Sequence, residues 1–303
     1  MTRLTDQNTS QDTKDEAGKV NARNNPELVS ARDTPVVRSS DVQLASFPRS
    51  GNTWMMNILL RGGVMALTPE AFRASAVFPA HLLPHAGLLK QSVAALQNRW
   101  DTGPLRVIKT HELPRIWSRK AIYVYRDGRD VITSFFFYLK SRGQIPEQLS
   151  FSRFLWEDMS TRSAWASQIG DPDFMGKGPA ALWAKHVNYW FASKRFMNLF
   201  FIRYEDLLAD PLPILKKMFS FLGVERTDEY LEKIIEETRF EKLQKTEPVK
   251  GMKSADGNNR FFRSGTKGNW HKHFTDVDVE KFKEQGGQTL IELGYEEDLK
   301  WRL

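Results

Sequence analysis

The chain has 303 residues, and 44 Lys and Arg against 37 Asp and Glu give it a formal net charge of +7 at pH 7. Hydrophobic residues make up 41% and aromatic residues 12% of the chain, enough for a packed core, so a wholly disordered protein is excluded. No cysteine occurs, which excludes disulfides, cysteine-bound zinc and thiol nucleophiles. The sequence shows neither a secretory signal pattern nor an apolar run of about 18 residues, so we expect a cytoplasmic protein without a membrane span.

Residues 1–35 are expected to form a disordered tail, and residues 36–303 a single domain. The five basic and six acidic residues of the tail nearly cancel, and the first aromatic residue of the chain is Phe47. Such a segment buries too little apolar surface to offset the entropy that it would lose on ordering. The positive charge therefore belongs to the domain, which predicts an anionic ligand.

Short apolar runs alternate with helical periods from residue 41 onward. Strands are predicted at 41–47, 105–109, 121–125 and 199–204, and helices at 53–60, 129–140, within 182–198, and at 212–222, 228–238 and 279–293. Strands that alternate with helices imply an α/β fold, with a mostly parallel central sheet flanked by helices. Segments 61–103 and 141–180 fit this pattern poorly, and we interpret them as helical insertions or lids.

The stretch 48–54 (PRSGNTW) joins the first predicted strand to a helix. The start of a helix offers unpaired N–H groups and the positive end of the helix dipole, both of which favour a phosphate or a sulfate. Gly51 allows a close approach of the backbone, and Arg49 adds a permanent charge. Ser50, Asn52 and Thr53 can supply further donors. A simple helix cap after a turn is the alternative interpretation of this stretch alone.

The phosphate loop differs from that of magnesium-dependent nucleoside triphosphatases, which reads GxxxxGK[ST]. A near miss at 170–178 has five residues between its glycines and Gly178 in the position of the hydroxyl. The sequence therefore predicts a P-loop-like nucleotide-binding core that lacks the magnesium-holding hydroxyl.

The stretch 48–54 resembles the P-[KR]-S-G-[TN]-T-W loop of the cytosolic-type sulfotransferases. These enzymes transfer a sulfuryl group from PAPS (3′-phosphoadenosine 5′-phosphosulfate) to a hydroxyl or an amine. Further motifs in the expected order extend the resemblance from about residue 41 to residue 276. The resemblance implies that PAPS is the sulfuryl donor and PAP the product. It also implies that the 5′-phosphosulfate is held by Arg49, Ser50, Gly51, Asn52, Thr53 and Trp54.

A second motif follows the strand predicted at 121–125. Arg126 and Ser134 are similar to the 3′-phosphate motif of the family, in which an Arg is followed eight positions later by a Ser. A guanidinium at the end of a strand can contact a phosphate through two hydrogen bonds. The alternative is a surface cluster of ion pairs formed by the four charged residues of 126–130.

The segment 261–270 (FFRSGTKGNW) resembles the R-K-G-x-x-G-x-W loop of the family. Arg263 and Gly265 match that loop, whereas Ser264 replaces its Lys and removes one charge from the 3′-phosphate site. Phe261 is expected to pack against the adenine. By resemblance, the rest of the adenine pocket consists of Trp54, Tyr204 of the YEDL motif, Thr238 and Phe240. Taken singly, each of these aromatic residues is more often part of a core.

The segment 109–114 (KTHELP) is similar to the K-T-H-x-x-P segment of the family, which makes His111 the general base and Lys109 a ligand of the sulfuryl group. An acceptor hydroxyl needs a base to take its proton, and histidine titrates near neutral pH. Arg49 and Lys109 would stabilise the charge that develops on the bridging and leaving oxygens. A sulfuryl group carries less charge than a phosphoryl group, so no metal is expected. A lone histidine is more often structural, but its place just past a strand end favours catalysis.

Two other functions are the alternatives to the sulfotransferase: a P-loop-type nucleotide kinase or phosphotransferase, and a basic, non-catalytic nucleic-acid-binding protein. The expected partner is a small, apolar acceptor with a hydroxyl or an amine, and not a nucleic acid. The dimer motif of the family, KxxxTVxxxE, is matched only in part, because Asp276 stands in the Val position. The oligomeric state is therefore left open.

Overall fold

The computed structural model describes residues 40–67, 105–114, 118–156, 178–246 and 267–303. The tail expected at 1–35 lies outside the described residues, as does most of the two segments interpreted as insertions or lids. The described residues form one α/β domain, as the sequence predicts.

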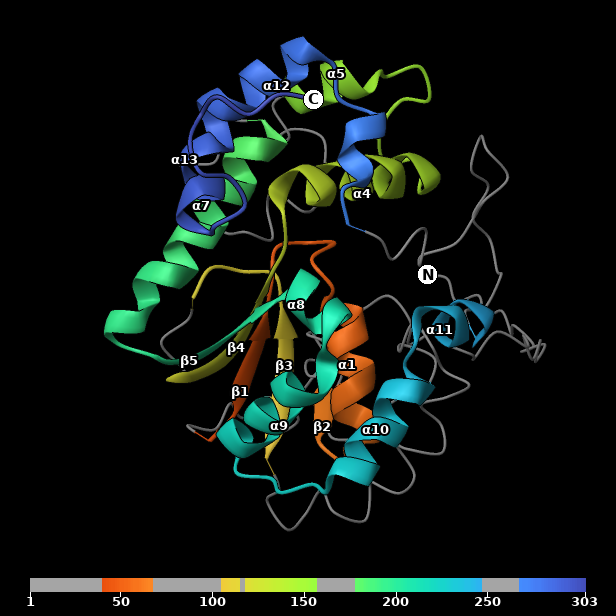
Figure 1. The fold of residues 1–303 in the computed structure, drawn as a ribbon, viewed down its shortest axis with the longest axis vertical. Coiled ribbons are helices and arrows are strands. Elements are labelled where there is room, and N and C mark those ends of the chain that lie inside the picture. Colours follow the sequence, from red (N-terminus) through yellow and green to blue (C-terminus); the bar gives the residue numbers. More distant parts are fainter. Residues whose placement is uncertain (1–39, 68–104, 115–117, 157–177, 247–266) are drawn as a thin grey trace, which may run out of the picture. The chain divides into compact units, whose positions relative to one another are not determined.

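A five-stranded parallel sheet lies at the centre of the domain, with the strand order β2-β3-β1-β4-β5 (Figure 1). The strands are β1 (Val42–Ala45), β2 (Met65–Leu67), β3 (Arg106–Thr110), β4 (Lys120–Tyr125) and β5 (Asn198–Arg203). In the register of the sheet, Leu44 of β1 lies between Lys109 of β3 and Ile122 of β4. Four strands were predicted. The fifth, β2, falls in segment 61–103, which we interpret as a helical insertion or lid. This interpretation is wrong for the three residues of β2, which are too few to show an alternating pattern.

Helices connect and flank the strands. They are α1 (Asn52–Arg61), α4 (Gly128–Ser141), α5 (Phe151–Trp156), α7 (Pro179–Ala192), α8 (Tyr204–Ala209), α9 (Pro211–Leu222), α10 (Asp228–Glu237), α11 (Phe240–Thr246), α12 (Asp276–Phe282) and α13 (Gln288–Glu292), with short 3₁₀ turns η6 (Ser193–Arg195) and η7 (Asn269–Lys272). The single helix predicted at 279–293 is instead α12, a π-helical turn η8 (Lys283–Gly287) and α13. Adjacent glycines explain the interruption: a Cβ at Gly286 would lie 2.9 Å from the Phe282 ring, and one at Gly287 2.7 Å from Leu299. No helix among these described elements has both the length and the apolar character needed to cross a bilayer.

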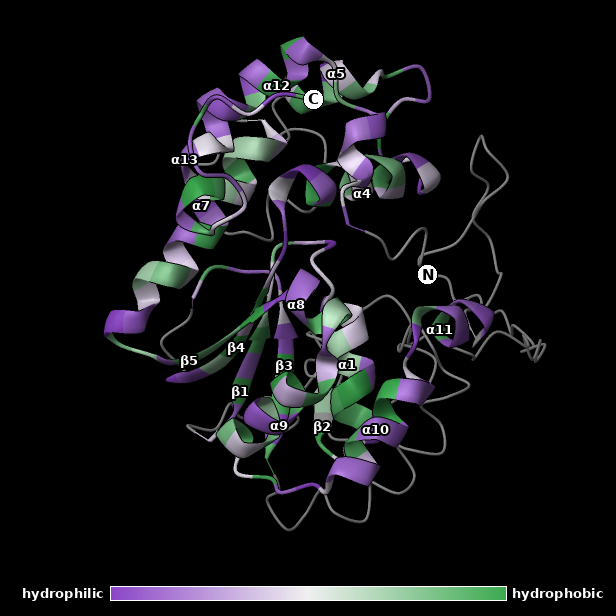
Figure 2. Ribbon diagram, in the orientation of Figure 1, coloured by the Kyte–Doolittle hydropathy of each residue, from purple (hydrophilic) through white to green (hydrophobic). Residues whose placement is uncertain are grey.

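Alternate residues of β4 face two separate cores. Ile122 and Val124 pack with the apolar faces of α1, α9 and α10, whereas Ala121 and Tyr123 pack with those of α4 and α7. In Figure 2, α1 is largely hydrophobic, whereas α11 is mostly hydrophilic. The sheet is thus covered on both faces, which leaves the ends of its strands for a site.

A buried ion pair closes the sheet where its strands begin. Arg106 donates from Nε and Nη2 to the two carboxylate oxygens of Asp41, at 2.7 and 2.6 Å, and both side chains are almost completely buried. Ser118 Oγ also donates to the backbone carbonyl of Asp41. The carboxyl ends of the strands lie at the opposite edge, where the predicted motifs begin.

Candidate active site

The loop between β1 and α1 is a tight turn with two residues of positive φ. Arg49 and Gly51 have φ angles of 72° and 104°, and Arg49 is the one non-glycine residue with positive φ in the described part of the chain. The first hydrogen bond within α1 runs from the Met55 N–H to the Gly51 carbonyl at 3.1 Å, so the N–H groups of residues 52–54 precede it and have no acceptor within the helix. The first turn of α1 contains no acidic residue. Curled backbone and a helix start together favour an anion.

Asn52 holds this loop in place. Its Nδ2 donates to the carbonyl of Leu44 at 3.3 Å, to Ser46 Oγ at 3.0 Å and to the carbonyl of Thr110 at 3.3 Å. The side chain thereby ties α1 to the ends of β1 and β3. The amide of Asn52, which the sequence predicts as a donor to a ligand, therefore donates to the protein itself. Its backbone N–H is the group of Asn52 that can still donate to a ligand.

Three buried polar atoms of the loop have no hydrogen-bond partner among the described residues, namely the donors Ser50 Oγ and Trp54 Nε1 and the amide oxygen Oδ1 of Asn52. Buried donors in folded proteins are generally satisfied, so such atoms indicate a missing partner. A ligand with several acceptor oxygens fits this requirement. The loop is therefore suited to a phosphate or sulfate group.

Arg49 lies against α4. Its Nε donates to Ser134 Oγ at 3.1 Å, and its Cζ lies 4.9 Å from the centre of the Tyr138 ring, one helical turn further along. The structure thus brings together the phosphate loop and the serine predicted for the second anion site. Sequence analysis did not indicate a role for Tyr138.

The ring of Tyr204 joins three of the predicted site residues. A Cβ at Gly51 would lie 2.7 Å from its Cδ2, so only glycine fits beneath it. Trp54 meets the Tyr204 ring edge to face at 5.7 Å between ring centres, and Arg126 Cζ lies 4.4 Å above it. The phosphate loop, the end of β4 and the YEDL motif therefore converge on one point.

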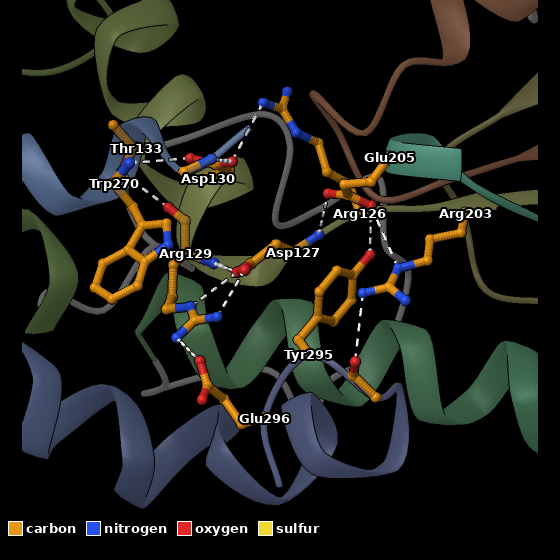
Figure 3. A network of polar contacts seen from close by, with 12 residues as sticks. Arg126, Asp127, Arg129, Asp130, Thr133, Arg203, Glu205, Trp270, Tyr295 and Glu296 are labelled. Atoms are coloured by element: carbon orange, nitrogen blue, oxygen red, sulfur yellow. Dashed lines mark hydrogen bonds and ion pairs between the residues drawn. The ribbon is translucent and has the colours of Figure 1, made fainter. Parts of the chain in front are cut away.

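Asp130 attaches the C-terminal motif to the same place. Its carboxylate accepts hydrogen bonds from the N–H groups of Gly268 and Trp270, at 2.7 and 3.0 Å, and it lies 3.7 Å from Arg126 Nη2 (Figure 3). This contact brings the end of segment 261–270 beside Arg126. The predicted ligands Phe261, Arg263, Ser264 and Gly265 lie outside the described residues.

The charged residues of 126–130 do not form the surface cluster of the alternative interpretation, because they are buried. Arg129 forms ion pairs with Asp127 and Glu296, and its guanidinium lies 4.2 Å from the Trp270 ring and 4.5 Å from the Trp301 ring.

Glu205 accepts from the Asp127 N–H at 3.1 Å and from Tyr295 Oη at 2.7 Å (Figure 3). The sequence did not predict these contacts. Glu205 carried a signal through the YEDL motif, and Asp127 belonged to the charged cluster of the alternative interpretation, but Tyr295 carried none.

His111 lies just beyond β3, next to the phosphate loop. Its Nδ1 is 2.8 Å from the carbonyl of Ser46 and must donate to it, so Nε2 carries the lone pair of the neutral ring. Burial lowers the pKa of His111 well below its ordinary value of 6.5, and the positive charges of Lys109 and Arg49 lower it further. Lys109 is paired with Leu44 in the sheet, on the face that α1 covers. The ring is thus held as an unprotonated base among cationic groups.

Thr238 and Phe240, predicted for the adenine pocket, lie at the junction of α10 and α11. The hydroxyl of Thr238 donates to the carbonyl of Ile234 at 2.8 Å. Its oxygen can therefore still accept a hydrogen bond, for example from an exocyclic amine. Phe240 is partly exposed. In the described ranges, no group of three or more acidic or histidine side chains could hold a metal ion.

An open α/β sheet with a helix start and a neutral histidine at the carboxyl ends of its strands is typical of enzymes that act on phosphorylated nucleotides. The sequence matches the family model described as Sulfotransferase domain over residues 39–294, and the chain therefore belongs to this family. It is a PAPS-dependent sulfotransferase, and neither the kinase nor the nucleic-acid-binding alternative is favoured.

Individual relatives agree with this assignment. A flavonol 3-sulfotransferase from Flaveria bidentis is 30% identical over 264 residues, which cover 80% of this chain and 79% of the relative. The crystal structure of mouse sulfotransferase SULT7A1 complexed with PAP has a TM-score of 0.56 at 22% identity and covers 84% of both chains. Retinol dehydratase in complex with androsterone and PAP has a TM-score of 0.57 at 20% identity, covering 84% of this chain and 82% of that one. The two structures show the same fold.

Proposed function

We propose that the protein transfers the sulfuryl group of PAPS to a small, apolar acceptor, at a hydroxyl or an amine, with His111 as the general base. The observation that carries this proposal is the hydrogen bond between His111 Nδ1 and the Ser46 carbonyl, 2.8 Å long. It joins a neutral histidine to Ser46, two residues before the phosphate loop at 48–54. A base and a site for the transferred group are thereby adjacent, as an in-line transfer requires.

We assign the 5′-phosphosulfate to the loop after β1, where Ser50 Oγ and the N–H groups of residues 52–54 would donate to it. PAPS supplies the sulfuryl group when it is bound there. Arg49 and Lys109 would stabilise negative charge on the bridging and leaving oxygens. We propose no metal, since these two cations supply the positive charge that metal ions provide in phosphoryl transfer.

We assign the 3′-phosphate to Arg126 and Ser134, with Arg263, Ser264 and Gly265 completing the site. The adenine is assigned to Trp54, Tyr204, Thr238, Phe240 and Phe261. Support comes from the convergence of Gly51, Trp54 and Arg126 on Tyr204. The unpartnered Nε1 of Trp54 gives this pocket a buried donor for the nucleotide.

The apolar acceptor is inferred from segments 62–103 and 141–180, which are rich in Phe, Leu, Trp and Met. The name of the flavonol 3-sulfotransferase and the androsterone bound in the retinol dehydratase structure are consistent with such an acceptor. We also propose that the protein acts in the cytoplasm, which fractionation of the host cells would test.

The test combines PAP binding by calorimetry with turnover of labelled PAPS on a panel of phenols, alcohols and amines, with EDTA present. We expect His111→Ala to lower turnover by at least about 100-fold, because the acceptor keeps its proton, while PAP affinity changes little. We expect Arg126→Ala to weaken PAP binding by about 10- to 100-fold, because a charge-assisted contact to phosphate is lost. Full turnover of the first variant would remove His111 from the base role, and normal PAP affinity of the second would remove Arg126 from the donor site.

A further inference from the structure

Beneath residues 109–114, here called the catalytic segment because they contain the proposed base, lies a buried histidine that the proposed chemistry does not use. His186 of α7 is completely buried, and its Nε2 is 3.1 Å from the backbone carbonyl of His111. Its Nδ1 is 2.9 Å from the hydroxyl of Tyr123 on β4. His186 therefore connects the middle of the sheet to the main chain of the proposed base.

The hydrogen-bonding roles in this chain follow from the carbonyl, which can only accept. Nε2 of His186 must carry the proton, so Nδ1 of the neutral ring accepts from the Tyr123 hydroxyl. Burial lowers the pKa of His186 to about 4, so the ring is neutral at physiological pH and the arrangement has one tautomer. Because His186 contacts the backbone of His111 and not its ring, it cannot relay the catalytic proton.

A second donor from the same face of α7 holds the next carbonyl. Trp190, one helical turn after His186, donates from Nε1 to the carbonyl of Glu112 at 3.1 Å. The Tyr123 ring stacks on the rings of both residues, at 5.2 Å from Trp190 and 5.7 Å from His186. Two successive carbonyls of the catalytic segment are thus held by rigid, buried side chains.

We propose that His186, oriented by Tyr123, is a positioning residue that fixes the main chain at His111 and thereby aims the ring of the base. This inference rests on the proposed role of His111. The ring of His111 is also held by its own Nδ1 bond to the Ser46 carbonyl. If the backbone of residue 111 moves, that bond loses its geometry and Nε2 no longer faces the acceptor. An error of about 1 Å in such a position can lower a rate by about 100-fold.

The test compares His186→Met, which removes the donor, with His186→Gln, whose amide can still reach the carbonyl. We expect kcat of His186→Met to fall by about 10- to 100-fold, with PAP affinity within about twofold of the wild type, and kcat of His186→Gln to recover most of the loss. Burial lowers the pKa of His111, and the cations Lys109 and Arg49 that face it lower it further. If the ring of His111 is looser and more hydrated, burial lowers this pKa less. The acid limb of the pH–rate profile should therefore move to higher pH in His186→Met only.

Val187→Ala provides the matched control, because it removes buried apolar volume from the neighbouring position of α7 and is expected to leave kcat unchanged. Tyr123→Phe keeps the stacked ring and removes only the hydroxyl, so it tests the proposal even if His186→Met does not fold. We expect it to lower kcat by about threefold or more. If His186→Met folds, a wild-type kcat in both variants would overturn the proposal. If it does not fold, a wild-type kcat in Tyr123→Phe alone would do so. Full turnover of His111→Ala would instead remove His111 from the base role, on which this inference rests.

Discussion

Replacing Gly51 by alanine tests whether the phosphate loop and Tyr204 form one donor site. The φ angle of Gly51 is 104°, well beyond the left-handed region that other residues tolerate, so an alanine there is strained by about 1–3 kcal/mol. Its Cβ would lie 2.7 Å from Tyr204 Cδ2, whereas ordinary contact begins at 3.4 Å. The Tyr204 ring must therefore retreat by about 0.7 Å, or the loop must move away from it.

Either movement disturbs the contacts through which Tyr204 holds the site. Arg126 lies over the same ring at 4.4 Å and Trp54 meets it at 5.7 Å. A partly buried cation–π contact contributes about 1–2 kcal/mol, and overpacking costs about 1–3 kcal/mol. We therefore expect Gly51→Ala to weaken PAP binding by at least about tenfold, since 1.4 kcal/mol corresponds to that factor.

Calorimetric titration with PAP measures this loss, and urea unfolding measures the accompanying change in stability. Gly223→Ala is the control, because Gly223 also has a positive φ, 75°, but nothing lies within 4 Å of an added Cβ. It should lower the free energy of unfolding by about 1 kcal/mol and leave PAP affinity unchanged. Wild-type PAP affinity in Gly51→Ala would refute the packing of Tyr204 on the loop.

Two further predictions concern pH and stability. Burial and nearby cations keep the pKa of His111 well below 6.5, so kcat should stay level down to pH 6.5 and decline only below it. Initial rates at saturating PAPS measure this pH dependence. A decline centred at or above pH 6.5 would contradict the environment described for His111. Asp41→Asn removes the carboxylate that pairs with the buried Arg106 guanidinium, and it should lower the free energy of unfolding by about 3–5 kcal/mol. PAP affinity should stay intact, because the pair lies where the strands begin, away from the site. Urea unfolding and calorimetry measure both quantities, and a loss below about 1 kcal/mol would contradict a large contribution of this ion pair.

Short, local patterns made much of the fold predictable. The strand at 120–125 and the helix after it, the loop at 48–54 and the histidine at 111 all follow from residues that are neighbours in sequence. The order of the parallel strands then brings their carboxyl ends to one edge. For this reason, the motifs that resemble those of the sulfotransferases could be assigned to one candidate site before any contact was known, and that assignment stays a prediction.

Contacts between distant residues could not be predicted. Asn52 faces inward because the carbonyl of Thr110, 58 positions away, needs its amide. Asp130 holds Gly268 across 138 positions, and Arg129 pairs with Glu296 across 167. No periodicity or spacing in the sequence links such partners. For this reason, the charged residues of 126–130, for which the sequence also allowed a surface cluster, are instead buried and paired with distant residues.

The bond between Arg129 and Glu296 has a consequence for biosynthesis. The ribosome makes the phosphate loop early, but the contacts at the start of α4 are complete only once residues 295–301 have been synthesised. Arg129 contacts Glu296 and Trp301, and Glu205 accepts a hydrogen bond from Tyr295. Pairings at such long range also form slowly. A nascent chain can thus build its sheet well before it gains affinity for the nucleotide, and premature termination near residue 294 would yield a protein that is largely folded but unable to bind the donor tightly.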